Sequence, residues 1–171
     1  VQTNGDPIAS PNGWLTDNAA FGSIAGNNVI VGVDLDGDGV LTDPIVPVME
    51  DVGGVPTRTF RFPADFGAAI DTEGNRKAAA VNAFFMANWY HDRLYLLGFD
   101  EAAGNFQQDN FSGEGAAEDP LLVAIQHTSD TFPSIPSDSP FFMSLPDGTM
   151  GFLNASFFTG ADPYRDAALD Q

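Results

Sequence analysis

The chain has no cysteine and only six basic residues, of which Lys77 is the single lysine, against 24 acidic ones. Without cysteine it forms no disulfide bond and has no thiolate for catalysis or metal binding. The formal net charge of −18 argues against a nucleic-acid partner, because neutralising phosphates requires lysine and arginine. This charge favours a bound cation, a basic protein partner, or simply an acidic surface that keeps the protein soluble.

Long apolar runs are also missing, since none approaches the roughly 20 residues of a membrane-spanning helix. We therefore expect no membrane span. The first residues, Val1–Gly5, contain neither an initiator methionine nor a signal peptide. We interpret them as a processed N-terminus and expect an extracytoplasmic protein, either periplasmic or secreted.

A length of 171 residues fits one domain over residues 1–171. Residues 1–28 are rich in Gly, Pro, Asn and Ser, with turn signals such as Asn12-Gly13. We expect this stretch to form an irregular N-terminal arm. Residues 29–171 are then expected to form a body made of a sheet and a helix.

Several short segments have the pattern of strands. Val29–Val33 and Leu121–Ile125 are β-branched or apolar runs that indicate buried strands, and Thr57–Phe62 alternates polar and apolar residues like a half-buried strand. A last strand is expected within 151–158. The Pro- and Ser-rich stretch 128–146 is typical of a loop.

One long helix is expected from Arg76 to Leu97, capped by Thr72 or Asn75 and followed by Gly98. A single helical segment among short strands predicts an α+β fold. We expect a twisted, mainly antiparallel sheet beside this one helix, with long irregular loops.

An acidic loop follows the first predicted strand. Asp34, Asp36 and Asp38 alternate before Gly39, which is the spacing of a calcium loop, because alternate carboxylates can converge on one hard cation. The twelfth position of such a loop, where a bidentate Glu is usual, is Ile45, although Asp43 could substitute. The alternative is a solvated acidic turn.

The predicted helix carries polar residues on its inner side. Spacings of three and four residues place these side chains on that side: Val81, Phe84, Phe85, Asn88, Asp92 and Tyr95. One interpretation makes His91 a metal ligand or a proton carrier. The other makes Asn88, His91 and Asp92 a structural polar network, since buried polar groups must find hydrogen bonds.

Aromatic side chains gather near the end of the chain. The concentration comprises Phe141, Phe142, Met143, Phe152, Phe157 and Phe158. Packing in the core is the favoured interpretation. The alternative is an exposed apolar patch on a loop that docks on a partner protein.

A longer motif runs from Asn82 to Gln107. It resembles the fungalysin-type secreted zinc metallopeptidases, in which a helix reading Asn-x-Phe-Tyr-x-x-Asn-x-x-His-Asp leads into Gly-Phe-Asp-Glu-x-x-Gly-Asn-Phe-Gln. The second half stands here as Gly98–Gln107. Asp6–Trp14 and Gly26–Val29 also resemble the start of the mature domain of that family, in the same order.

The resemblance implies a fold like the N-terminal subdomain of a thermolysin- or fungalysin-like peptidase. The family's zinc-binding His-Glu-x-x-His helix is expected beyond residue 165, and the sequence to Gln171 contains none. The resemblance therefore predicts no zinc site within this chain and favours the structural role for Asn88, His91 and Asp92. Calcium is then the one cofactor that the sequence suggests. The missing zinc motif argues against an enzyme.

A second departure from the family concerns its substrate-binding edge strand, Asn-Asn-Ala-Asn-Phe, which precedes Pro-Asp-Gly. Here Pro146-Asp147-Gly148 is present, but the preceding residues are Asp138–Leu145. Pro140 removes a backbone N–H from that edge, and aromatic side chains replace the amides.

Two functions follow as hypotheses. The favoured one is a non-catalytic extracytoplasmic protein derived from a fungalysin-like subdomain, which acts as a structural or interaction subunit and docks through residues 132–158. Phe141, Phe142, Met143, Phe157 and Phe158 would then contact other, possibly basic, protein subunits. The alternative is the N-terminal part of a secreted zinc endopeptidase whose catalytic half lies elsewhere.

Overall fold

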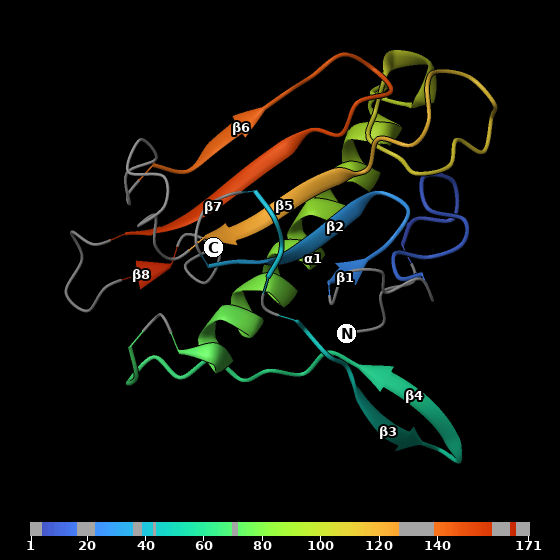
Figure 1. Ribbon diagram of the computed structural model, residues 1–171. Coiled ribbons are helices and arrows are strands. Elements are labelled where there is room, and N and C mark those ends of the chain that lie inside the picture. Colours follow the sequence, from blue (N-terminus) through green and yellow to red (C-terminus); the bar gives the residue numbers. More distant parts are fainter. Residues whose placement is uncertain are drawn as a thin grey trace.

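The computed structural model describes residues 5–16, 23–35, 39–42, 44–69, 72–126, 139–158 and 165–166. The elements are β1 (Ile24–Ala25), β2 (Val29–Asp34), β3 (Val48–Val52), β4 (Val55–Thr59), α1 (Glu73–Leu96), a 3-10 turn η2 (Glu101–Ala103), β5 (Leu121–Gln126), β6 (Phe141–Met143), β7 (Phe152–Phe158) and β8 (Arg165–Asp166). One long helix among short strands confirms the α+β prediction (Figure 1).

The main sheet has the strand order β1-β2-β5-β7-β6, and β8 pairs with β7. Strands β1, β6 and β8 pair antiparallel, as do the strands of the β3–β4 hairpin, whereas β2, β5 and β7 run parallel to one another. The predicted antiparallel pairing therefore holds at the margins, while the centre of the sheet is parallel. The centre is parallel because α1 lies in the connection from β2 to β5, and parallel neighbours require such a crossover.

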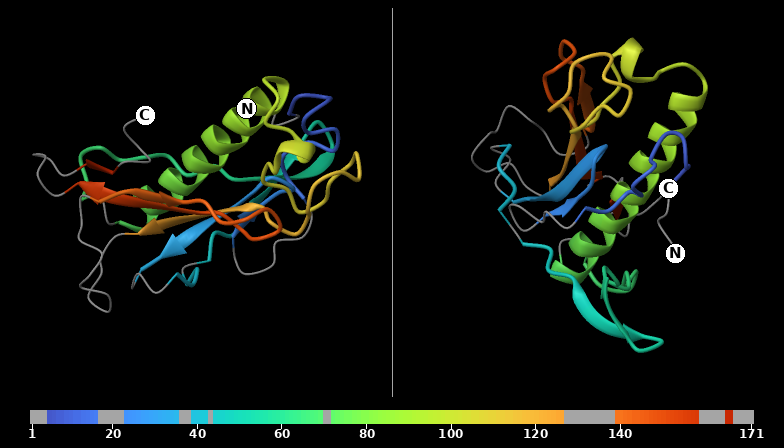
Figure 2. Two further views of the ribbon diagram at one scale, coloured as in Figure 1. Left: turned by 90° about the horizontal axis from the view of Figure 1, so that it is seen from above. Right: turned by 90° about the vertical axis from the view of Figure 1, so that its right-hand side faces the viewer.

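Helix α1 covers one face of this sheet (Figure 2). Strands β2 and β5 contribute Val31, Val33, Val123 and Ile125 to the core, each with no exposed surface. Ala79 and Ala80 of α1 are also fully buried, and their small side chains let the helix backbone approach the sheet. Each buried Val or Ile contributes about 1.5–3 kcal/mol, so this layer is the main source of stability.

The ends of α1 are defined by side-chain and backbone caps. The hydroxyl of Thr72 accepts a hydrogen bond from the amide of Asn75, so Thr72 is the N-cap, one of the two predicted caps. At the other end the amide of Phe99 donates to Leu94 and that of Gly98 to Tyr95, which is a Schellman motif. Gly98 has a φ of +100°, a conformation that favours glycine.

Two strand predictions need correction. Strand β4 runs from Val55 to Thr59 rather than from Thr57 to Phe62, because the Gly53-Gly54 turn pairs β4 with β3 from its first residue. Within the predicted loop 128–146, residues 141–143 form β6 by pairing with β7. A strand of three residues has too little sequence pattern to be recognised, and its partner alone defines it.

The N-terminal arm is closely joined to the sheet. Strand β1 lies within the stretch 1–28 that was expected to be irregular throughout, and it pairs with β2. Gly26 follows β1, and a Cβ atom there would lie 1.7 Å from the carbonyl oxygen of Trp14. Only glycine therefore lets the arm approach the turn between β1 and β2. In the described part of the chain, no helix has both the length and the apolarity to span a membrane.

Replacing Gly98 with Ala should destabilise the protein by roughly 1–2 kcal/mol, the cost of a left-handed conformation with a Cβ. No atom lies within 4 Å of the position that this Cβ would take, so the cost comes from the backbone alone. Gly74→Ala, inside α1 and equally unobstructed, should instead stabilise by about 0.5–1 kcal/mol. Urea unfolding midpoints measure both, and equal midpoints for the two variants would contradict this assignment of the C-terminal cap.

Candidate functional site

The carboxylate of Asp92 is the centre of a buried polar network between α1 and the N-terminal arm. Its Oδ2 accepts hydrogen bonds from the amide of Asp6 at 2.7 Å and from the indole N–H of Trp14 at 2.8 Å. Its Oδ1 accepts from the hydroxyl of Ser10 at 2.6 Å and contacts Nδ1 of His91 at 3.2 Å. With Asp92 only 5% exposed, both oxygens are satisfied by protein groups.

These contacts determine the charge of Asp92. Burial disfavours the ionised form, but the hydrogen bonds from His91, Ser10, Asp6 and Trp14 favour it and together hold the pKa of Asp92 below its ordinary value. The carboxylate is therefore ionised at neutral pH, which makes the four hydrogen bonds charge-assisted and stronger than neutral ones.

His91 is held between two partners. Its Nδ1 faces Asp92, and its Nε2 lies 3.3 Å from the side-chain amide nitrogen of Asn105. With its proton on Nδ1 the ring would donate to Asp92 and accept from Asn105 at Nε2. Since both ring nitrogens are engaged, His91 could bind a metal only by giving up one of these contacts.

Asn88 joins a third segment to the network. Its side-chain oxygen accepts from Nδ2 of Asn28 at 3.1 Å, and its own Nδ2 donates to the carbonyl of Phe84. Nδ2 of Asn28 also donates to the hydroxyl of Ser10 at 2.9 Å. The three predicted residues Asn88, His91 and Asp92 thus lie together and reach the arm and the start of β2.

Sequence reasoning missed most of the other members of this network and of the loop that follows α1. Ser10 and Asn28 come from segments that look like turns. Buried Glu101 accepts the amides of Phe111 and Ser112, each at 2.6 Å, and so anchors the loop after η2. The only signal for Glu101 in the sequence was its place in the motif Gly98–Gln107.

The predicted calcium ligands are only partly within the described residues. Asp34 ends β2 with 1% of its surface exposed, and its Oδ2 accepts from the amide of Gly39 at 2.9 Å. Asp36, Asp38 and Asp43 lie outside the described residues. Within the described ranges, no three side chains of His, Cys, Asp or Glu come close enough to hold a metal ion.

The aromatic residues lie at one edge of the sheet. Strand β6 is the outer neighbour of β7, and Pro140 directly precedes it. Phe141 packs against Phe152 with ring centres 5.7 Å apart, whereas Phe142 is 53% and Met143 45% exposed. The side chains of Phe157 and Phe158 lie outside the described part.

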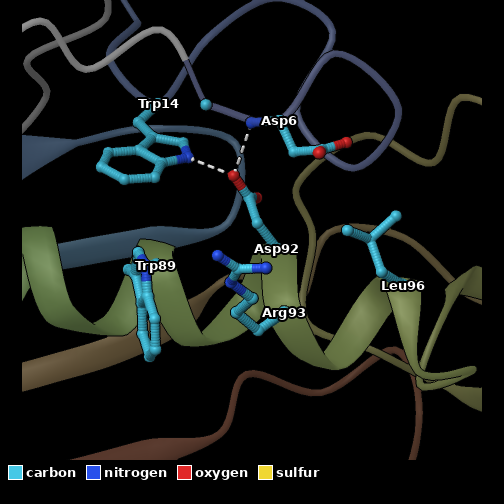
Figure 3. Close-up of a pocket in the computed structure, with 7 residues that line it drawn as sticks. Asp6, Trp14, Trp89, Asp92, Arg93 and Leu96 are labelled. Carbon is cyan, nitrogen blue, oxygen red and sulfur yellow. Dashed lines mark hydrogen bonds between the residues drawn. The ribbon is translucent and has the colours of Figure 1, made fainter.

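A pocket lies beside the network, where the arm meets the second half of α1 (Figure 3). This arm–helix cavity has a volume of about 310 Å³ and is lined by Gly5, Asp6, Trp14, Trp89, Asp92, Arg93 and Leu96. Arg93 lies over the indole of Trp89, with its guanidinium carbon 5.4 Å from the ring centre. The cavity thus combines apolar walls with charges of both signs.

Comparison with known proteins relates the chain to a family of metallopeptidases and to extracellular members of it. The sequence profile of the fungalysin metallopeptidase family (M36) matches residues 1–171. An extracellular metalloproteinase of Pyricularia oryzae is 31% identical over 168 residues, and one of Fusarium vanettenii is 30% identical over 159 residues. They cover 96% and 92% of this chain but 24% and 23% of their own length.

A third relative is an extracellular metalloproteinase of Aspergillus flavus, 36% identical over 115 residues, or 67% of this chain. The match covers 17% of that protein. The chain therefore spans about a quarter or less of the length of these relatives, and the activity of the whole protein does not follow from the match alone.

Replacing Asp92 with Asn should destabilise the protein by about 2–3 kcal/mol at neutral pH, because a neutral amide has one acceptor oxygen for four donors. Because the folded pKa is lowered, the stabilisation by Asp92 is present above the unfolded pKa of about 3.9 and is lost as pH falls through the folded pKa.

The difference in unfolding free energy between the native chain and Asp92→Asn should therefore shrink below about pH 4. Asp109→Asn is the matched control, since Asp109 is exposed and no described group binds its carboxylate. A difference that stays constant from pH 7 to about pH 3 would show that folding does not lower the pKa of Asp92.

Proposed function

The chain belongs to the fungalysin metallopeptidase family, and from this premise we propose that it forms the sheet-and-helix scaffold of an extracellular fungalysin-type peptidase. In this role the chain itself contributes no zinc ligand. The observation that carries the proposal is the Asp92 network, which uses His91 as a structural partner of an ionised carboxylate. A zinc peptidase needs three protein ligands and an open position for water.

The scaffold would present the β6 edge of its sheet. Strand β6 has a neighbour only on its β7 side among the described strands, and an extended peptide can add to such an edge by main-chain hydrogen bonds. A catalytic half bearing the zinc would lie beside this edge. The extracellular location named for the relatives supports an extracytoplasmic protein.

A second function, that of a non-catalytic interaction subunit, is supported by a different observation. Pro140 has no N–H to offer at the edge, and Phe142 and Met143 expose about half of their surfaces there. Such a surface suits an apolar patch on another protein better than a peptide backbone. With a charge of −18, a basic partner subunit would associate faster and in a salt-sensitive manner.

The intact mass and zinc content of the native secreted protein separate the two functions. A mass well above that of this chain with one bound zinc supports the peptidase scaffold, since this chain covers only 24% of such a relative. A mass near 18.1 kDa, with no zinc and a stable second protein, supports the interaction subunit.

The purified 171-residue chain is expected to hydrolyse no casein, with or without added zinc, because both functions leave the zinc ligands outside it. The measurement is release of labelled peptides, with EDTA as the control. Cleavage by homogeneous protein that EDTA abolishes would overturn both functions.

The acidic loop gives a separate proposal, in which Asp34, Asp36, Asp38 and Asp43 bind calcium. Calcium should then raise the melting temperature, since a ligand that binds only the folded state stabilises it. Asp36→Asn together with Asp38→Asn should abolish the increase, while Asp109→Asn should leave it unchanged. The same melting temperature in EDTA and in millimolar calcium would remove this site.

Replacing Phe141 and Phe142 with Ser tests the edge as a docking surface. Phe142→Ser alone should weaken assembly with a partner more than it lowers stability, because half of that ring is exposed and it meets only the edge-on ring of Phe106 among the aromatic contacts of the described residues. Phe141→Ser should mainly lower stability, because its ring packs on Phe152. If both variants lose stability yet assemble normally once folded, the docking surface lies elsewhere.

A further inference from the structure

The arm–helix cavity has no part in either function, yet its lining is chemically specific. Its volume of about 310 Å³ is at the lower end of the range for small-molecule sites, roughly 300–1,000 Å³. Trp14, Trp89 and Leu96 supply apolar surface, and Figure 3 shows the two indoles, the charged groups and Leu96 grouped around the end of Asp92. Trp89 is 39% and Leu96 49% exposed, so the cavity is reachable from solvent.

Arg93 is the cationic group of the cavity. It forms no ion pair with any described carboxylate, although the chain has 24 acidic residues and only six basic ones. Its guanidinium instead lies on the indole of Trp89. A planar group held in this way keeps its N–H donors available for a carboxylate, which it can bind in a bidentate manner.

Asp6 is the anionic group of the cavity whose carboxylate can still accept a hydrogen bond from a ligand. Its Oδ1 accepts the amides of Ile8 at 2.8 Å and Ala9 at 3.2 Å and so closes the turn of the arm. No described group donates to its Oδ2. Asp92, by contrast, has both oxygens occupied and adds only its charge.

The sign of the charges decides what kind of ligand fits. Two carboxylates and one guanidinium leave the cavity with a net negative charge, and the chain around it is strongly acidic. A simple anion would be repelled, and a simple cation would leave Arg93 without a partner. A ligand that carries an ammonium and a carboxylate next to an apolar group satisfies Asp6, Arg93 and the tryptophans together.

We propose that the arm–helix cavity binds a free α-amino acid with a large apolar side chain. The carboxylate pairs with Arg93, the ammonium group with Oδ2 of Asp6, and the side chain lies among Trp14, Trp89 and Leu96. This site is distinct from the edge of β6 and needs neither zinc nor a partner.

The chain contains two tryptophans, and both line the cavity, so intrinsic fluorescence reports directly on binding. The probes are leucine, glycine, leucinamide and N-acetylleucine, titrated into the full 171-residue chain. Leucine should change the fluorescence saturably, and glycine should not. Leucinamide lacks the carboxylate and N-acetylleucine lacks the ammonium, so each should bind about tenfold more weakly than leucine.

Two variants assign the charges. Arg93→Gln should bind leucine and leucinamide equally, because the partner of the carboxylate is gone. Asp6→Asn, which keeps the oxygen that closes the turn, should bind leucine and N-acetylleucine equally. Arg61→Gln is the matched control for Arg93, because Arg61 is an exposed arginine beside Glu50. Asp65→Asn is the matched control for Asp6, because the carboxylate of Asp65 likewise accepts a hydrogen bond from the backbone amide two residues later. Both control variants should bind leucine like the native chain.

Three results would overturn the proposal: no saturable response to leucine, an Arg93→Gln variant that still prefers leucine to leucinamide, or a derivative that binds as tightly as leucine. The last result would show that the cavity takes one end of a peptide, the N-terminal end for leucinamide and the C-terminal end for N-acetylleucine. Arg93 is exposed, so its variant is expected to fold, and the urea midpoint verifies this for each variant.

Discussion

The rest of the structure depends on one buried negative charge. Asp92 can remain ionised inside the protein only because four donors surround it, and two of them, the amide of Asp6 and the indole of Trp14, belong to the N-terminal arm. The arm has little regular structure of its own, so this carboxylate determines where it lies. An unpaired carboxylate at this depth would cost several kcal/mol, which couples the placement of the arm to the folding of α1.

The parallel centre of the sheet positions this charge. The crossover through α1 brings β5 beside β2, and the valines and isoleucine of these strands pack under the alanines of the helix. One side of α1 is thereby fixed against the sheet, and Asn88 and Asp92 are buried toward the arm and the start of β2. The exposed side of the second half of α1 carries Trp89 and Arg93, which line the arm–helix cavity.

The polar network gives the His and Asp of this helix hydrogen-bonding partners within the protein. His91 contributes its ring as a hydrogen-bonding bridge between Asp92 and Asn105. Family membership agrees with the proposed scaffold, in which residues outside this chain would bind the catalytic metal.

The sequence alone determined the class of fold, the single long helix with its Gly98 end, and the family, because these depend on local propensity and on a motif contiguous in the chain. It left the N-cap open between Thr72 and Asn75. It also predicted that Asn88, His91 and Asp92 lie together in one polar network. Only the tertiary structure decided the parallel centre, the strand β6, the partners of Asp92 and the arm–helix cavity. Each of these features depends on contacts between residues that are far apart in the chain, such as Asp6 and Asp92. No local sequence pattern predicts such long-range contacts.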